Sequence, residues 1–209
     1  FRIVNGTARY TTAFTPPTSP LTAVANTQLL TLQYNGGANN YGIIDNGPFN
    51  NALTRVGNAT QGTFSPYSQT GWSNYFNGST DYFTVPATST AFGANPWTIE
   101  GWFYITSLSS ACVLVDTRNS SAGNNGVQMS VLADGSLYWF EGSASSIIVL
   151  GAGTITTNRW YHIAYVRSST ATNGCTLYID GVSRGTGTSN LVHAGYTTYI
   201  GRNAAAVQD

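Results

Sequence analysis

The 209-residue sequence predicts an all-β protein, folded as one antiparallel sandwich of two sheets. Three observations favour this fold class. Helical periodicity is nearly absent, short apolar runs recur at intervals of roughly ten residues, and Gly, Asn, Asp and Ser separate these runs. A chain of this length buries about 70% of its unfolded surface, so a single core is the simplest interpretation.

The expected strands follow one another along most of the chain. Two Asp-Gly pairs, Asp134–Gly135 and Asp180–Gly181, predict tight hairpin turns, because both residue types tolerate a positive φ angle. The strands are expected at residues 28–33, 81–85, 97–106, 112–117, 127–133, 137–141, 147–150, 160–167, 175–179 and 196–201.

Alternation along the strand at 97–106 identifies core positions. Trp97, Ile99, Phe103 and Ile105 share one face of this strand, and we expect that face to be buried between the sheets.

The N-terminal part of the chain has a different composition. Residues 1–10 read as a strand, and Pro16, Pro17 and Pro20 then force an extended path that is neither helix nor central strand. We therefore divide the chain into a strand at 1–10, a Thr/Pro-rich linker at 11–26 and a sandwich domain at 27–209.

Charge is sparse and balanced, with eight basic residues, all of them Arg, and eight acidic residues. This balance argues against nucleic acids and anionic membranes as partners. No apolar stretch approaches the roughly 18 residues that span a bilayer, so membrane insertion is not expected. A surface of Ser, Thr, Asn and Gly suits a protein exposed outside the cell, on a virion or on a cell-surface fibre.

Five motifs in order carry a family resemblance. They are Tyr-Phe-Asn-Gly-Ser-Thr-Asp-Tyr-Phe-Thr-Val-Pro at 75–86, Trp-Thr-Ile-Glu-Gly-Trp-Phe-Tyr at 97–104, Trp-Tyr-His-Ile-Ala-Tyr-Val-Arg at 160–167, Leu-Tyr-Ile-Asp-Gly-Val at 177–182 and Tyr-Ile-Gly-Arg at 199–202. With them the chain resembles the laminin-G-like, concanavalin A-like lectin/glucanase superfamily, in the version found in phage virion and bacterial surface proteins. The resemblance covers about residues 26–209 and implies an antiparallel jelly-roll sandwich.

The closing strand of the family is divided between the two ends of this chain. Family domains close with a segment similar to Gly-Tyr-Ile-Asp-Asp-Phe-Arg-Ile-Val-Asn-Gly-Thr-Ala-Xaa-Tyr. Here residues 206–209 stop within that pattern and residues 1–10 match its second half. The resemblance implies that residues 1–10 complete a preceding repeat, with subunit contacts made by Phe1, Arg2, Ile3, Val4 and Tyr10.

The predicted function follows from this division. Head-to-tail strand donation or tandem repeats would make the chain a structural subunit of an extracellular filament, such as a phage tail or virion fibre or a bacterial surface fibril, whose partners are copies of itself. Regular filaments in electron micrographs would support this hypothesis, and monodisperse particles would contradict it. Alternatively, residues 1–10 fold back on their own domain and close a circularly permuted monomer.

A second function class is a carbohydrate-binding adhesion domain with cell-surface glycans as partners. Exposed aromatic rings stack on sugars, and Trp72 and Trp139 are the candidates for that role.

The sequence does not predict an enzyme, and no catalytic residue is assigned. Family glycanases carry carboxylates at alternate positions of one strand. Glu100 and Glu141 are the only glutamates, and neither has a carboxylate two residues away. We expect His162 to be a hydrogen-bonded residue of its sheet and not a catalyst.

Two pairs of residues are candidates for cross-linking or metal binding. Cys112 and Cys175 are predicted to form a disulfide that closes a loop of about 60 residues, which would contribute ~4 kcal/mol; two free thiols are the alternative. The resemblance implies Asp45 and Asp209 as Ca²⁺ ligands, with turn capping as the alternative for Asp45. No cofactor is required.

Glycosylation is the last expectation. The number of Asn-x-Ser/Thr sites is about what chance gives, and the extended Thr/Pro segment is the better candidate for O-linked sugar. The candidates are Asn5, Asn58, Asn77, Asn119, Thr15, Thr18 and Ser19.

Overall fold

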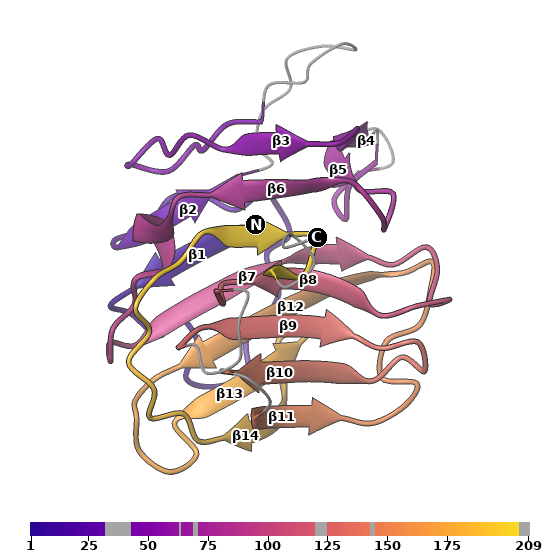
Figure 1. The fold of residues 1–209 in the computed structure, drawn as a ribbon. Coiled ribbons are helices and arrows are strands. Elements are labelled where there is room, and N and C mark those ends of the chain that lie inside the picture. The colour runs from indigo at the N-terminus through magenta and orange to yellow at the C-terminus, as the bar shows by residue number, and fades with distance from the viewer. Residues whose placement is uncertain (32–42, 63, 69–70, 120–124, 143–144, 205–209) are drawn as a thin grey trace.

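The structure, a computed structural model, describes residues 1–31, 43–62, 64–68, 71–119, 125–142 and 145–204. Within these residues the chain forms two antiparallel sheets that face each other, as Figure 1 shows, with one short 3-10 helix at Ala87–Thr90. The predicted all-β jelly-roll sandwich is confirmed.

The first sheet has six strands in the described part of the chain. Their order is β14 (Val182–Gly187), β13 (Cys175–Ile179), β12 (Trp160–Arg167), β7 (Trp97–Tyr104), β1 (Arg2–Asn5) and β2 (Thr27–Leu30).

The second sheet has seven described strands. Their order is β11 (Ser145–Leu150), β10 (Leu137–Glu141), β9 (Val127–Val131), β8 (Cys112–Asp116), β15 (Thr198–Ile200), β6 (Tyr82–Val85) and β3 (Thr54–Val56). A separate hairpin pairs β4 (Thr60–Gly62) with β5 (Ser73–Tyr75).

Each expected strand has a counterpart in the sandwich, although residues 32–33 of the first one lie outside the described residues. The strands β3, β4, β5 and β14 were not expected. They are short or rich in Ser, Thr and Gly, so no apolar alternation marks them.

The main core lies between the two sheets. Trp97 and Ile99 of β7 are fully buried there, and Phe103 and Ile105 pack against the same cluster. Trp139 also belongs to this core, with no exposed surface, so its assignment as an exposed sugar-stacking residue is wrong. The physical reason is the strict alternation of β10, in which every second residue faces inward.

The N-terminal strand β1 pairs within its own chain. It lies between β2 and β7, with Ile3 opposite Ile99, and both Ile3 and Val4 have no exposed surface. This is the arrangement of the alternative in which residues 1–10 fold back on their own domain. Donation of the same strand to a second copy stays a prediction.

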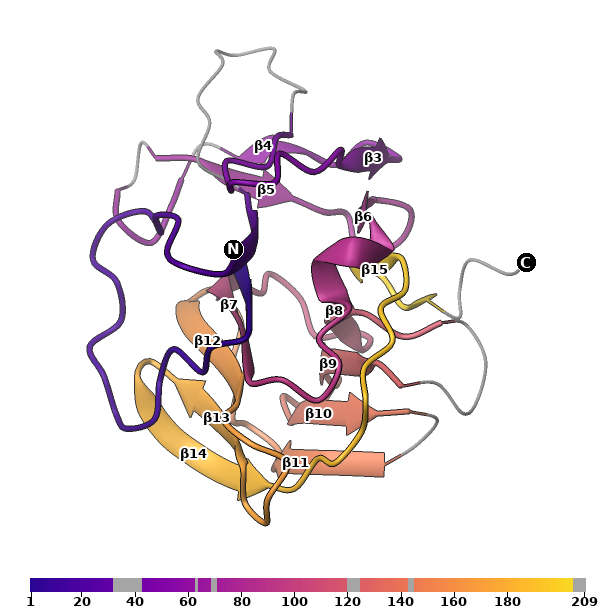
Figure 2. The same ribbon diagram turned by 90° about the vertical axis from the view of Figure 1, so that its left-hand side faces the viewer.

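The segment that follows β1 covers the outer face of the six-stranded sheet. Figure 2 shows this indigo segment passing outside β12 and β13. Tyr10 and Phe14 stack with their ring centroids 3.6 Å apart and pack on Tyr178. The Phe14 amide donates to the carbonyl of Gly181 at 2.9 Å. Residues 11–26 contain no helix or strand, and Phe14 packs this segment against the domain that it was expected to precede.

A buried polar network lies beneath this segment. The Glu100 carboxylate accepts from the Arg2 guanidinium at 2.5 and 3.0 Å and from the Tyr10 hydroxyl at 2.7 Å. The Nε2 atom of His162 lies 3.2 Å from the same carboxylate. Burial alone would raise the pKa of Glu100, but His162, Arg2 and Tyr10 together lower it to about 2. The network explains why polar residues are tolerated on this covered face.

Candidate functional site

Two glycines bring the free edges of the two sheets together. A Cβ atom on Gly185 would lie 2.9 Å from Cγ2 of Ile148, and one on Gly187 would lie 2.4 Å from the carbonyl oxygen of Ile147. Larger residues cannot occupy these positions without a shift, so β14 lies close against β11. A cleft lies beside this contact and is lined by residues of both strands.

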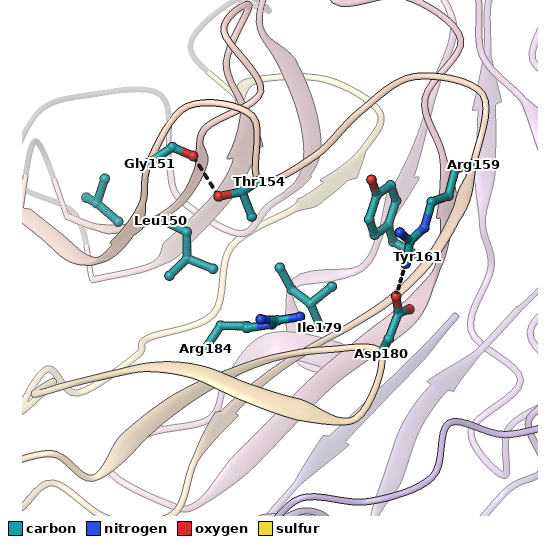
Figure 3. A pocket seen from close by; sticks show the side chains of 9 residues that line it. Leu150, Gly151, Thr154, Arg159, Tyr161, Ile179, Asp180 and Arg184 are labelled. Carbon is teal, nitrogen blue, oxygen red and sulfur yellow. Dashed lines mark hydrogen bonds and ion pairs between the residues drawn. The ribbon is translucent and has the colours of Figure 1, made fainter.

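The cleft has a volume of about 370 Å³, within the range of small-ligand sites. It lies beyond the end of β11, beside the β13–β14 turn and the start of β12 (Figure 3). The residues that shape it include Leu150, Thr154, Arg159, Ile179, Asp180 and Arg184.

One wall of the cleft is the hairpin turn between β13 and β14. Asp180 has a φ of 51° and Gly181 a φ of 76°, as a tight turn requires, so the predicted turn is confirmed. The Asp180 carboxylate accepts from the His162 amide at 3.0 Å and from the Arg159 guanidinium at 2.5 Å. These contacts fix the turn against the start of β12.

The opposite wall is the loop that follows β11. Its Gly153 amide donates to the carbonyl of Asp134, and its Ile155 amide donates to the carbonyl of Gly135, both at 2.9 Å. Asp134 and Gly135 form the second predicted hairpin turn, in which Gly135 has a φ of 81°. The two turns therefore hold the two walls. Within the loop, the Thr154 hydroxyl donates to the carbonyl of Gly151 at 2.6 Å (Figure 3).

The two arginines of the cleft differ in their partners. Arg159 forms an ion pair with Asp180 and stacks over the ring of Tyr161, with 4.4 Å from Cζ to the ring centroid. The Arg184 side chain is exposed and has no hydrogen bond or ion pair with any residue that the structure describes. Leu150 and Ile179 supply apolar surface beside it. The site thus combines one unpaired cation, hydrogen-bonding groups and an apolar floor.

Asp45, a candidate calcium ligand, caps a turn. Its carboxylate accepts from the amides of Leu30, Gly47 and Asn51 and from the side-chain amide of Asn51, at 2.7 to 2.8 Å. The other candidate, Asp209, lies outside the described residues. Across the described ranges, no group of three or more His, Cys, Asp and Glu residues could hold a metal ion.

The predicted disulfide between Cys112 and Cys175 is wrong, because both are free thiols. Cys175 pairs with Arg167, which lies opposite Trp97 at the beginning of β7. The Cys112 sulfur lies 3.6 Å from the carbonyl oxygen of Ser107, just beyond the end of β7. An eight-residue strand spans roughly 23 Å, and a disulfide requires Cα atoms within about 7 Å.

The glycosylation candidates occupy different environments. The side-chain amide of Asn5 donates to the carbonyl of Ala91, and the side-chain oxygen of Asn77 accepts from the backbone amides of the turn that follows it. Glycosylation itself stays a prediction. The remaining candidates are exposed: Asn58, Asn119, Thr15, Thr18 and Ser19.

Sequence reasoning did not single out Arg159, Asp180 or Arg184 as site residues. The Asp-Gly pair at 180 was the one available signal, and it identified a turn and not a site. Trp72, the other aromatic candidate for sugar stacking, is partly buried and does not line the cleft.

The comparisons with solved structures concern the fold. A structure described for the dependence of botulinum neurotoxin type C cell entry on two ganglioside molecules matches with a TM-score of 0.59 and 13% identity, over 84% of this chain and 42% of that one. The binding domain of botulinum neurotoxin DC in complex with SialylT matches at 0.60 and 13%, over 83% and 42%. A Trypanosoma rangeli sialidase matches at 0.51 and 16%, over 94% and 31%. The chain thus spans less than half the length of each.

In the described residues, no helix has the length and apolar character needed to cross a membrane. A search of the curated proteins finds no match. The family model of the concanavalin A-like lectin/glucanases superfamily matches residues 77–209, and the chain belongs to this superfamily.

Proposed function

We propose that this protein is a carbohydrate-binding domain whose binding site is the cleft between β11 and β14. The observation that carries the proposal is the composition of the cleft, where the Arg184 guanidinium and the Arg159–Asp180 pair adjoin the apolar surface of Leu150 and Ile179. Sugars present hydroxyl groups and apolar ring faces side by side, so they require this combination of partners. Membership of a lectin-containing superfamily supports the proposal.

We place the protein among binding domains and not among glycosidases. A glycosidase of the common kinds needs two carboxyl groups across the scissile bond. Asp180 is the one carboxylate among the described residues that line the cleft, and Arg159 and the His162 amide already engage it. Binding outside the cell, as the composition suggests, is part of the proposal.

A sugar-binding function does not require the protein to assemble with a second copy of itself. The filament hypothesis was motivated by the match of residues 1–10 to the family's closing strand, and β1 pairs on both sides within its own chain, with β7 and β2. The cleft lies at the edge of that sheet formed by β14, away from β1.

The test is an immobilised glycan array probed with the full chain and two variants of Gly151. A Cβ atom at this residue would meet nothing within 4 Å, and the residue lines the cleft. Gly151→Phe should therefore fold normally, fill part of the cleft and weaken binding about tenfold or more, whereas Gly151→Ala should bind like the wild type. Circular dichroism melts check that both variants are folded. A wild type that binds no glycan, or a Gly151→Phe variant that binds as well as the wild type, would overturn the proposal.

A further inference from the structure

We infer that the sugar recognised by the cleft is anionic and carries a carboxylate or sulfate group that Arg184 binds. This inference rests on the proposed function and specifies the class of ligand. It starts from the charge balance of the cleft, which has two arginines and one carboxylate among its described lining residues.

Arg159 is not the free cation of the site. The Asp180 carboxylate accepts from its guanidinium at 2.5 Å, and the Tyr161 ring lies beneath it. A ligand anion at Arg159 would have to compete with Asp180, and it would be repelled by that carboxylate.

Arg184 remains available. Its side chain is exposed, has no partner among the described residues, and extends from β14 toward Ile179 in Figure 3. The neighbouring Gly185 keeps β14 against Ile148 of β11, which fixes the strand from which Arg184 projects. A guanidinium group presents paired N–H donors that match the two oxygens of a carboxylate or sulfate.

The surroundings of Arg184 strengthen such a contact. Leu150 and Ile179 are the apolar residues beside it, and a bound sugar would exclude water from this part of the cleft. Electrostatic attraction increases as the local dielectric falls. A neutral sugar would leave Arg184 solvated, so it should still bind, but more weakly.

The experiment compares neutral, carboxylate-bearing and sulfate-bearing forms of the same oligosaccharides with the full chain. The wild type should prefer at least one charged form by about tenfold or more, and this preference should fall as the salt concentration rises. The two charged forms distinguish a carboxylate ligand from a sulfate ligand.

Two matched variants assign the preference to its residue. Arg184→Gln should bind the charged forms no more tightly than the neutral form. Arg9→Gln, which alters an exposed arginine that does not line the cleft, should keep the preference.

The outcomes separate this inference from the proposed function. Equal wild-type binding of neutral and charged forms, or a preference that survives in Arg184→Gln, would overturn the inference and leave carbohydrate binding intact. Binding of no form would overturn both.

Discussion

Replacing Arg2 by alanine should lower the free energy of unfolding by about 3–5 kcal/mol, because the change leaves the buried Glu100 carboxylate without its cation. Arg2 is 4% exposed and Glu100 is 1% exposed, so water cannot replace the lost partner. Urea unfolding followed by circular dichroism at pH 7 measures the loss. Arg9→Ala is the matched control, since Arg9 belongs to the same segment and is exposed; its change should stay within about 0.5 kcal/mol.

The pH dependence of this loss identifies its cause. In the folded protein the pKa of Glu100 is lowered from 4.5 to about 2. A carboxylate with a lowered folded-state pKa contributes stability above pH 4.5, and that contribution disappears as the pH falls toward 2. The difference between the wild type and Arg2→Ala should therefore shrink across this range. A difference below about 1 kcal/mol at pH 7, or one that does not change with pH, would contradict an electrostatic role for the pair.

The same network shows how far the sequence could predict the fold. Alternation in β7 correctly predicted that Trp97 and Ile99 face the core. It could not show that Thr98 and Glu100, on the other face, are buried as well. Their burial depends on residues that are distant in the sequence, namely Tyr10 and the segment around it, and periodicity within one strand carries no information about such a cover.

The candidate site was predictable in its parts but not as a whole. The turns at 134–135 and 180–181 were predicted because positive φ angles restrict residue choice strongly. Their assembly into one cleft depends on the contact between β11 and β14, two edge strands of different sheets. The strand β14 contains Gly185 and Gly187 and shows no apolar alternation, so neither the strand nor its contact could be inferred.

The prediction of a disulfide failed for a related reason. Cys112 and Cys175 each begin a strand, and both readings as strand residues were correct. A strand can begin at either end of the sandwich, and the order of the strands in space determines which end it is. That order was not available from the spacing of the two cysteines.

Replacing Trp139 by alanine should lower the free energy of unfolding by about 3–5 kcal/mol, the cost of removing a large aromatic side chain from a core. Its ring lies 5.2 Å from the ring of Trp97 and 5.5 Å from that of Tyr165, so it joins β10 of one sheet to β7 and β12 of the other. Phe140→Ala provides the control on the same strand. Phe140 is partly buried on the opposite face, where it stacks on Tyr138, and its loss should cost about 1 kcal/mol.

The glycan array decides between the two roles considered for Trp139. At a temperature where the variant is folded, Trp139→Ala should keep the glycan binding of the wild type, because the residue has no exposed surface and does not line the cleft. A ring that stacked on sugar would give the reverse pattern, with binding lost and stability nearly unchanged. That result would mean that Trp139 faces solvent, and it would remove the residue from the core that holds the two sheets together.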